Sequence, residues 1–300
     1  AYRSYVQKFV PRLKAFTIAV DGSCGVAGSI VPRVFEGLPV KVVPTNVEPN
    51  GRSPFLGRRF PAAQAQSALR QAVRSSGARL GAAVDFDGDM VAFFDENGEP
   101  IANDATVALL AGELLTRTPG ARIGFDLRYS AAVREEIINA GGQPRACPAD
   151  PVVLSRAARQ KEVLYAADTV GRHFFRDLFG AESPVLAILL MCSLLSRRDE
   201  PLSRMAAHVT RYRRSGELRY ETPSPEAAGP LFEELRGEFR SAESDGLDGL
   251  TIRFPNWWFN LRQPGGTTSL RLTVEGRTSG DERRGRAAVE KIIKKHQTEK

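Results

Sequence analysis

The stretch that decides the fold reads Val84-Asp85-Phe86-Asp87-Gly88-Asp89-Met90 and continues as Val91-Ala92-Phe93-Phe94-Asp95-Glu96-Asn97-Gly98. Three aspartates stand at alternate positions between two short apolar runs, residues 80–84 and 91–94. This pattern predicts a strand, a tight acidic loop and a second strand, closed by a turn at Asn97-Gly98. The carboxylates of Asp85, Asp87 and Asp89 would repel one another unless a cation lies among them. Hard oxygen ligands of this kind suit Mg²⁺.

Other interpretations of the acidic loop exist. A solvated acidic turn is the simplest one. An EF-hand loop has Gly at its sixth position, where Met90 stands, and helices on both sides, so it is excluded although Glu96 falls at the twelfth position. A haloacid-dehalogenase-type phosphatase would use Asp85 as nucleophile and Asp87 as acid/base. It stays an alternative, although that class normally has Thr or Val where Asp89 stands.

The composition describes an ordered soluble protein with two or three domains. The chain has 300 residues, of which 42% are hydrophobic and 26% are charged. Its net charge of +7 favours anionic partners, but the basic residues are mixed with acidic ones along the chain. We therefore expect small phosphorylated ligands, and no nucleic acid, since no nucleic-acid-binding motif is present.

Cysteine usage and hydropathy indicate a cytoplasmic protein with no membrane partner. Cys24, Cys147 and Cys192 are far apart and not in CxxC spacing, which predicts buried thiols in a reducing compartment. The longest apolar run, residues 185–192, is too short to span a bilayer, and no signal peptide is visible. The chain begins with Ala1 instead of Met, so one hypothesis is that a segment precedes it.

Apolar periodicity over the first two thirds of the chain predicts alternating strands and helices. Strand 16–20 runs into the glycine-rich turn 22–28 and a helix at 30–35, which is either an anion-binding turn or a plain strand-to-helix connection. A strand at 40–43 and a helix at 65–73 precede the acidic loop. Helices at 105–115, 131–139, 151–161 and 185–195 and strands at 123–125 and 163–166 follow it. This alternation is typical of α/β domains.

The last third changes character from about residue 212. Strands are predicted at 217–221, 250–254 and 269–275, with helices at 227–239 and 284–295, which gives an α+β module. A turn containing Pro264 follows Arg262. It would present Arg262, Thr267 and Thr268 as an anion cradle, because guanidinium and hydroxyl groups match phosphate oxygens. The alternative is a plain hairpin.

Taken in order, these segments resemble the α-D-phosphohexomutases, the family of phosphomannomutase and phosphoglucomutase. The resemblance extends over nearly the full length. It is carried by Gly22-Ser-Cys-Gly-Val-Ala-Gly28, Pro49-Asn50-Gly51, the acidic loop with its Phe-Phe-Asp-Glu-Asn-Gly exit, Asp126-Leu-Arg-Tyr-Ser130, Gly171 with Phe174-Phe175, Trp258-Phe-Asn-Leu-Arg262, and Leu270-Arg-Leu-Thr-Val-Glu275.

The resemblance implies two successive mutase-type α/β domains with mixed sheets, followed by a C-terminal α+β domain. Residues 1–103 would resemble the family's domain II with its metal loop, residues 104–211 domain III with its sugar loop, and residues 212–300 the C-terminal domain with its phosphate loop. It also implies site residues: Mg²⁺ on Asp85, Asp87 and Asp89, a sugar loop with Asp168, Gly171 and Arg172, and hexose-phosphate contacts from Arg262, Thr267 and Thr268.

The sequence departs from the family pattern in its catalytic loops. No Ser-His-Asn-Pro loop, which carries the family's phosphoserine, occurs in these residues. Met90 replaces an Arg of the metal loop, and Val170 and Arg172 replace a Ser and a His of the sugar loop. Pro264, Gly265 and Gly266 stand where Ser, Asn and Thr are expected.

We therefore assign no catalytic residue and expect this chain alone to be impaired or inactive as a mutase. One hypothesis is that a separate polypeptide or an upstream segment supplies the serine domain. Another is a non-catalytic protein that binds sugar phosphate or metal in a regulatory role.

Overall fold

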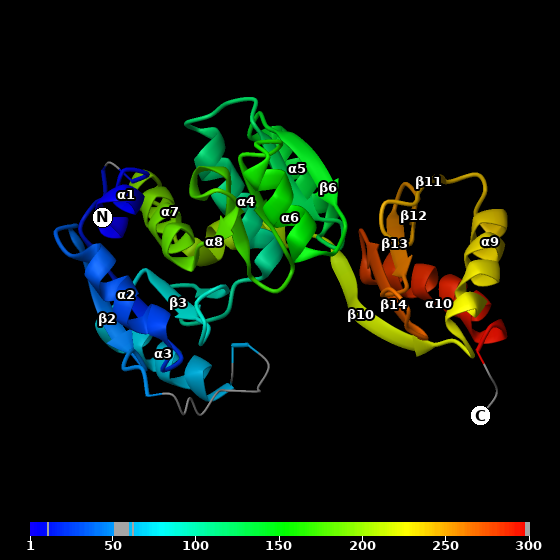
Figure 1. Cartoon of the computed structure of the whole chain (residues 1–300), viewed down its shortest axis with the longest axis horizontal. Helices are drawn as coiled ribbons and strands as arrows, with labels where there is room; N and C mark the ends of the chain where they lie inside the picture. The colour runs from blue at the N-terminus through cyan, green and yellow to red at the C-terminus, as the bar shows by residue number, and fades with distance from the viewer. Residues whose placement is uncertain (11, 51–59, 62, 298–300) are drawn as a thin grey trace. The chain divides into compact units, whose positions relative to one another are not determined.

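The computed structural model describes residues 1–10, 12–50, 60–61 and 63–297 (Figure 1). The chain forms two compact units, Ala1–Thr210 and Arg211–Lys300. The second unit covers nearly the residues expected for the C-terminal segment. The expected boundary near residue 103 lies inside the first unit, so the division into three domains stays a prediction. Gly51 of the Pro49-Asn50-Gly51 motif lies outside the described residues.

The first sheet of the larger unit carries the acidic loop. Its strand order is β2-β1-β3-β4. Strands β1 (Phe16–Asp21), β2 (Val40–Thr45) and β3 (Leu80–Val84) are parallel, and β4 (Val91–Phe94) runs antiparallel to β3. Every residue of β3 is buried, as expected for a strand inside a sheet that is covered on both faces. Strands β3 and β4 have the predicted limits.

Three helices accompany this sheet: α1 (Tyr2–Gln7), α2 (Val26–Phe35) and α3 (Ala63–Ser76). Helix α2 begins inside the glycine-rich turn, four residues before its predicted start. Helix α3 packs Leu69 and Val73 against Ala19 and Phe94 of the sheet. Helix α3 therefore supports β3 and β4, the strands on either side of the acidic loop.

The second sheet of the larger unit is also mixed. Its order is β6-β5-β7-β8-β9. Strands β5 (Arg122–Asp126), β6 (Gln143–Cys147) and β7 (Tyr165–Ala167) are parallel, whereas β8 (His173–Phe175) and β9 (Ala181–Glu182) are antiparallel neighbours. The sequence did not predict β6, β8 or β9, because each is short and carries no clear alternation of apolar and polar residues.

Five helices belong with the second sheet: α4 (Asn103–Leu115), α5 (Ala131–Asn139), α6 (Pro151–Arg159), α7 (Pro184–Arg197) and α8 (Leu202–Val209), and the short 3₁₀ helix η1 spans Arg176–Leu178. Nearly every residue of α7 is buried, so this apolar helix belongs to the core of the larger unit. Among the residues described, no helix has the length and apolar character needed to cross a membrane.

The described residues of the smaller unit form an antiparallel sheet with two α-helices and one short 3₁₀ helix, as the α+β prediction required. The strand order is β10-β14-β13-β12-β11. The strands are β10 (Arg213–Glu221), β11 (Glu243–Asp245), β12 (Leu250–Arg253), β13 (Trp257–Arg262) and β14 (Ser269–Gly276); the helices are η2 (Pro225–Ala227), α9 (Ala228–Glu238) and α10 (Ser279–Lys295). Leu235 of α9 and Ile293 of α10 share one core with Phe259 and Leu272 of the sheet.

Helix α10 begins five residues before its predicted start at residue 284. A capping box causes the difference. The hydroxyl of Thr278 accepts the amide of Asp281, and the Asp281 carboxylate accepts the amide of Thr278. This reciprocal pair satisfies amides that the first helical turn leaves without partners.

Candidate functional site

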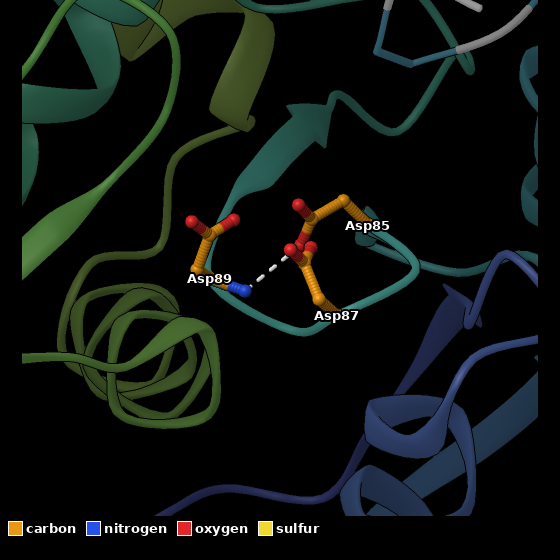
Figure 2. Close-up of side chains that lie close together, drawn as sticks. All are labelled: Asp85, Asp87 and Asp89. Atoms are coloured by element: carbon orange, nitrogen blue, oxygen red, sulfur yellow. Dashed lines mark hydrogen bonds between the residues drawn. The ribbon is translucent and has the colours of Figure 1, made fainter. Parts of the chain in front are cut away.

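The three aspartates of the acidic loop converge in the turn between β3 and β4. One carboxylate oxygen from each of Asp85, Asp87 and Asp89 lies within 4.8 Å of the others. Figure 2 shows the three side chains and the hydrogen bond that the Asp89 amide donates to Asp85. The Oδ1 atom of Asp85 accepts the amides of Asp89 at 2.9 Å and Met90 at 2.8 Å. One oxygen of Asp85 therefore shapes the loop.

The other oxygens of the cluster suit a metal ion. Asp85 is only 5% exposed. Among the described residues, its Oδ2 and the Oδ1 of Asp89 are buried and have no hydrogen-bond partner. Buried polar atoms normally have partners, and buried carboxylates are normally paired or bound to metal. Since all these ligand atoms are carboxylate oxygens, the cluster fits Mg²⁺ or a similar hard cation.

The pKa values of Asp85 and Asp89 are shifted in opposite directions. Burial, together with the neighbouring carboxyl groups of Asp89 and Asp87, raises the pKa of Asp85 to about 8. Burial also acts to raise the pKa of Asp89, but the interactions of its carboxylate with Asp85 and Arg172 outweigh burial and lower that pKa. The cluster thus resists carrying all its negative charges at once, as expected for adjacent carboxylates.

The glycine-rich turn 22–28 packs directly against the acidic loop. A Cβ atom at Gly25 would overlap the backbone of Phe86. Conversely, Gly88 has φ +83°, and a Cβ there would lie 2.9 Å from the Cβ of Ala27. Glycine is thus required where the two backbones approach. The glycine-rich turn therefore supports the backbone of the acidic loop.

The expected sugar loop joins β7 to β8 and is shaped by Asp168, which is 3% exposed. Asp168 Oδ1 accepts the amides of Val170, Gly171 and Arg172 at 3.0, 3.1 and 2.9 Å. Its backbone carbonyl accepts the hydroxyl of Tyr129. Burial raises the pKa of Asp168, although these hydrogen bonds and Arg172 oppose that effect. The structure therefore shows Asp168 as the carboxylate that fixes this loop.

The acidic loop and the loop at 168–172 contact each other. The amide of Val91 donates to the carbonyl of Gly171 at 2.9 Å. The Nε atom of Arg172 donates to Asp89 Oδ2 at 2.9 Å, and its Nη1 donates to Asp168 Oδ2 at 3.2 Å. The two predicted sites therefore form one constellation. No pattern in the sequence signals this ion pair, because the two loops are far apart in the chain.

A cavity of about 550 Å³ opens beside this constellation. Met90, Val170 and Arg172 line it together with apolar residues such as Phe93 and Ile101. Both loops thus contribute to a concave surface inside the larger unit, as is typical of small-ligand sites.

In the smaller unit, Arg262 pairs with Glu217 and is joined by Arg271, which the sequence analysis missed. Glu217 accepts Arg262 Nη2 at 2.9 Å and Arg271 Nη1 at 2.8 Å. The two arginines are cross-strand neighbours on β13 and β14. The Nε atoms of both are buried and have no partner among the described residues. Two donors are therefore left that an anion could accept.

The two threonines expected to bind phosphate already donate hydrogen bonds within the smaller unit. Thr267 donates its hydroxyl to the carbonyl of Pro264 at 2.9 Å. Thr268 donates its hydroxyl to Glu221 at 2.8 Å. Each hydroxyl can still accept a hydrogen bond, but neither has its proton available for a phosphate oxygen in this arrangement.

Comparison with known proteins gives consistent results. A family model described as phosphoglucomutase/phosphomannomutase, alpha/beta/alpha domain II, matches residues 2–98. A relative from Xanthomonas campestris pv. campestris (strain B100), named "Phosphohexose mutases", is 32% identical over 285 residues, which cover 94% of this chain and 63% of that protein. The chain therefore spans somewhat less than two thirds of the length of this relative.

Solved structures show the same fold. A phosphoglucomutase/phosphomannomutase family protein from Burkholderia thailandensis aligns with a TM-score of 0.82 and 23% identity, over 98% of this chain and 64% of that one. The N-acetylphosphoglucosamine mutase of Aspergillus fumigatus, solved in complex with GlcNAc-6P and magnesium, aligns with a TM-score of 0.66 and 14% identity, over 98% of this chain and 70% of that one.

Proposed function

This chain belongs to the α-D-phosphohexomutase family, and from that premise we propose that it binds a hexose phosphate and a divalent cation for mutase-type phosphoryl transfer. The observation that carries the proposal is the three-aspartate cluster, in which two buried carboxylate oxygens have no partner among the described residues. The similar mutase from Aspergillus fumigatus was solved with a sugar phosphate and magnesium, which supports this choice of ligands.

Asp85, Asp87 and Asp89 are the proposed ligands of Mg²⁺. When bound, the cation would neutralise negative charge on the phosphoryl group that is transferred. Asp85 has a second task, since its Oδ1 atom holds the amides of Asp89 and Met90 and so fixes the loop around the cation. Such a preformed loop lowers the cost of ordering the ligands on binding.

The other two loops are the proposed substrate contacts. Asp168 and Gly171 set the shape of the sugar loop, and Arg172 gives it a positive charge. In the smaller unit, Arg262 and Arg271 would grip the substrate's phosphate through their guanidinium donors, and Glu217 holds both arginines in place until then. Thr267 and Thr268 would contribute by accepting a hydrogen bond or by reorienting their hydroxyls.

A complete mutase reaction needs a phosphoserine. Its phosphoryl group is transferred to a sugar hydroxyl, which gives a hexose bisphosphate, and the other phosphoryl group of that bisphosphate then returns to the serine. These 300 residues contain no Ser-His-Asn-Pro loop. We therefore propose that they turn over hexose phosphates slowly or not at all by themselves, and that a serine-bearing element on this or another polypeptide completes the site.

A dehalogenase-type phosphatase is not the better explanation. Similarity to a phosphoglucomutase/phosphomannomutase structure covers 98% of this chain. In addition, Asp85, the nucleophile in that hypothesis, already has one oxygen committed to two backbone amides. Its pKa is also raised to about 8 by burial and by its neighbours, which disfavours the carboxylate nucleophile.

Calorimetry and a mutase assay on the same chain test the proposal. We expect saturable binding of Mn²⁺ or Mg²⁺ and of mannose 1-phosphate or glucose 1-phosphate. With the 1,6-bisphosphate added, we expect little or no turnover. Flat titrations with both ligands would contradict the binding function. Metal-dependent turnover would show that the residues present are sufficient for the reaction.

A further inference from the structure

We infer that Arg172 is a built-in counter-ion of the three-aspartate cluster, which competes with the divalent cation for Asp89 and so lowers the cation affinity of the site. This inference rests on the proposed cation-binding function. It assigns Arg172 a role at the metal site in addition to its place in the sugar loop.

The competition follows from where the guanidinium lies. Four carboxylates gather here, those of Asp85, Asp87, Asp89 and Asp168. Arg172 bridges two of them, with Nε at 2.9 Å from Asp89 and Nη1 at 3.2 Å from Asp168. Asp89 is at the same time one of the three aspartates whose oxygens approach within 4.8 Å. One carboxylate is therefore shared between the arginine and the candidate cation site.

The backbone holds Arg172 in this position. Gly171 accepts the amide of Val91, and residues 90 and 172 form an antiparallel bridge. Asp168 Oδ1 accepts the amide of Arg172 itself at 2.9 Å. Because the loop is fixed to strand β4, the guanidinium has a high effective concentration at Asp89. A cation in solution must compete with a partner that is always present.

The cluster nevertheless retains room for a ligand. Asp85 is 5% exposed, and its Oδ2 has no hydrogen-bond partner among the described residues. The Oδ1 atom of Asp89 is also buried and has no hydrogen-bond partner among the described residues, whereas its Oδ2 accepts a hydrogen bond from Arg172. Arg172 therefore satisfies only part of the cluster. A divalent ion that binds the remaining oxygens meets a fixed positive charge close by, which weakens its binding.

Titration of the whole chain with Mn²⁺, followed by calorimetry, tests the inference. Arg172→Gln removes the charge and keeps a polar side chain, and we expect it to tighten Mn²⁺ binding about tenfold. Arg172→Lys keeps the positive charge near the cluster, so binding should stay within about threefold of the unaltered chain. The matched control is Arg176→Gln, which removes the same charge from a side chain that pairs with Asp177. We expect no change beyond about twofold.

The outcomes separate this inference from the proposed function. If the unaltered chain binds Mn²⁺ and Arg172→Gln binds equally or more weakly, the inference is wrong and the proposed function stands. If only Arg172→Gln binds, the inference is supported, while cation binding by the natural chain is contradicted. Binding by neither protein would contradict both.

A measurement on the unaltered protein covers the case in which Arg172→Gln does not fold. We expect the ¹H–¹⁵N signal of Arg172 Nε, identified by its loss in Arg172→Lys, to shift as diamagnetic Mg²⁺ is added, because the cation withdraws Asp89 from the guanidinium. A signal that stays in place while Mg²⁺ binds would overturn the inference.

Discussion

The amide of Val91 donates to the carbonyl of Gly171 at 2.9 Å. This hydrogen bond joins strand β4, which follows the acidic loop, to the loop at residues 168–172. Gly171 has φ +105°, and a Cβ atom there would lie 2.7 Å from the carbonyl oxygen of Val91. The position therefore requires glycine for its backbone conformation and for the close approach of strand β4. The position of Arg172 next to Asp89 depends on this contact.

Gly171→Ala is expected to destabilise the larger unit by about 3 kcal/mol, because it combines left-handed strain with a steric clash. Gly141→Ala is the matched control, since Gly141 also has positive φ but nothing within 4 Å of an added Cβ. It should cost only about 1 kcal/mol. Urea unfolding measures both values. Equal losses would show that the contact with Val91 tolerates a side chain.

Asp85→Asn should weaken cation binding strongly while the fold is kept. The amide oxygen can still accept the two backbone amides, but an NH₂ group replaces the oxygen that lacks a partner. We expect Mn²⁺ affinity to fall at least about tenfold. Without metal, the melting temperature at pH 7 should rise slightly, because the folded chain no longer has to bury a carboxyl group whose pKa is raised to about 8. Added Mg²⁺ should stabilise the unaltered chain and not the variant. Equal stabilisation of both would contradict a ligand role for Asp85.

His173 should make stability depend on pH. It is 2% exposed, and its Nδ1 atom lies 2.6 Å from the Tyr165 hydroxyl. Burial lowers the pKa of His173 from 6.5 to about 3. Below pH 6.5 the unfolded chain therefore binds a proton that the folded chain does not. This contribution to stability is fully present above that pH and falls by about 1.4 kcal/mol per pH unit toward pH 3.

His173→Gln should flatten the curve of unfolding free energy against pH between about 6.5 and 4. His208→Gln, which removes an imidazole with a 71% exposed side chain, is the control and should leave the slope unchanged. Urea unfolding at several pH values measures the slopes. The same slope in His173→Gln as in the unaltered chain would mean that His173 is protonated in the folded state.

Glu113 is expected to be a major stabilising carboxylate of the larger unit. Its side chain is 1% exposed, and it accepts from Arg117, Arg197 and Ser193 at 3.1, 2.7 and 2.7 Å. Glu113→Ala removes this shared acceptor, and because the two arginines left behind are partly exposed, we expect a loss of about 1–3 kcal/mol. The control is Glu36→Ala, which breaks an exposed pair with Arg3 and should cost less than about 1 kcal/mol. If urea unfolding gave comparable losses of unfolding free energy for the two variants, Glu113 would not be a major stabilising carboxylate.

Arg271 should bind phosphate together with Arg262. We expect Arg262→Ala and Arg271→Ala each to weaken binding of mannose 1-phosphate about tenfold, because each removes a charged donor from the shared site. Arg236→Ala removes an arginine that pairs with the exposed Glu233 and should have no effect. Calorimetry measures the affinities. An effect of Arg262→Ala alone would exclude Arg271 from the phosphate site.

The sequence alone predicted the mixed α/β and α+β classes and the limits of several elements. Strands β3 and β4 begin and end where their apolar runs do, and α5 has its predicted limits. These limits could be predicted because continuous apolar runs and helical periodicity depend on residues close together in the chain. The short strands β6, β8 and β9 were missed, because two to five residues carry too little pattern and the strands form only against their neighbours.

The candidate site divides in the same way. The closeness of Asp85, Asp87 and Asp89 follows from their local sequence, because a tight turn between two strands brings alternate residues to one place. Only the tertiary structure placed Arg172 beside Asp89 across 83 positions of the chain, and Arg271 beside Arg262 at Glu217. Such pairs depend on which strands and loops become neighbours when the apolar cores form. That choice is made by packing over the whole unit, not by the residues adjacent in the chain.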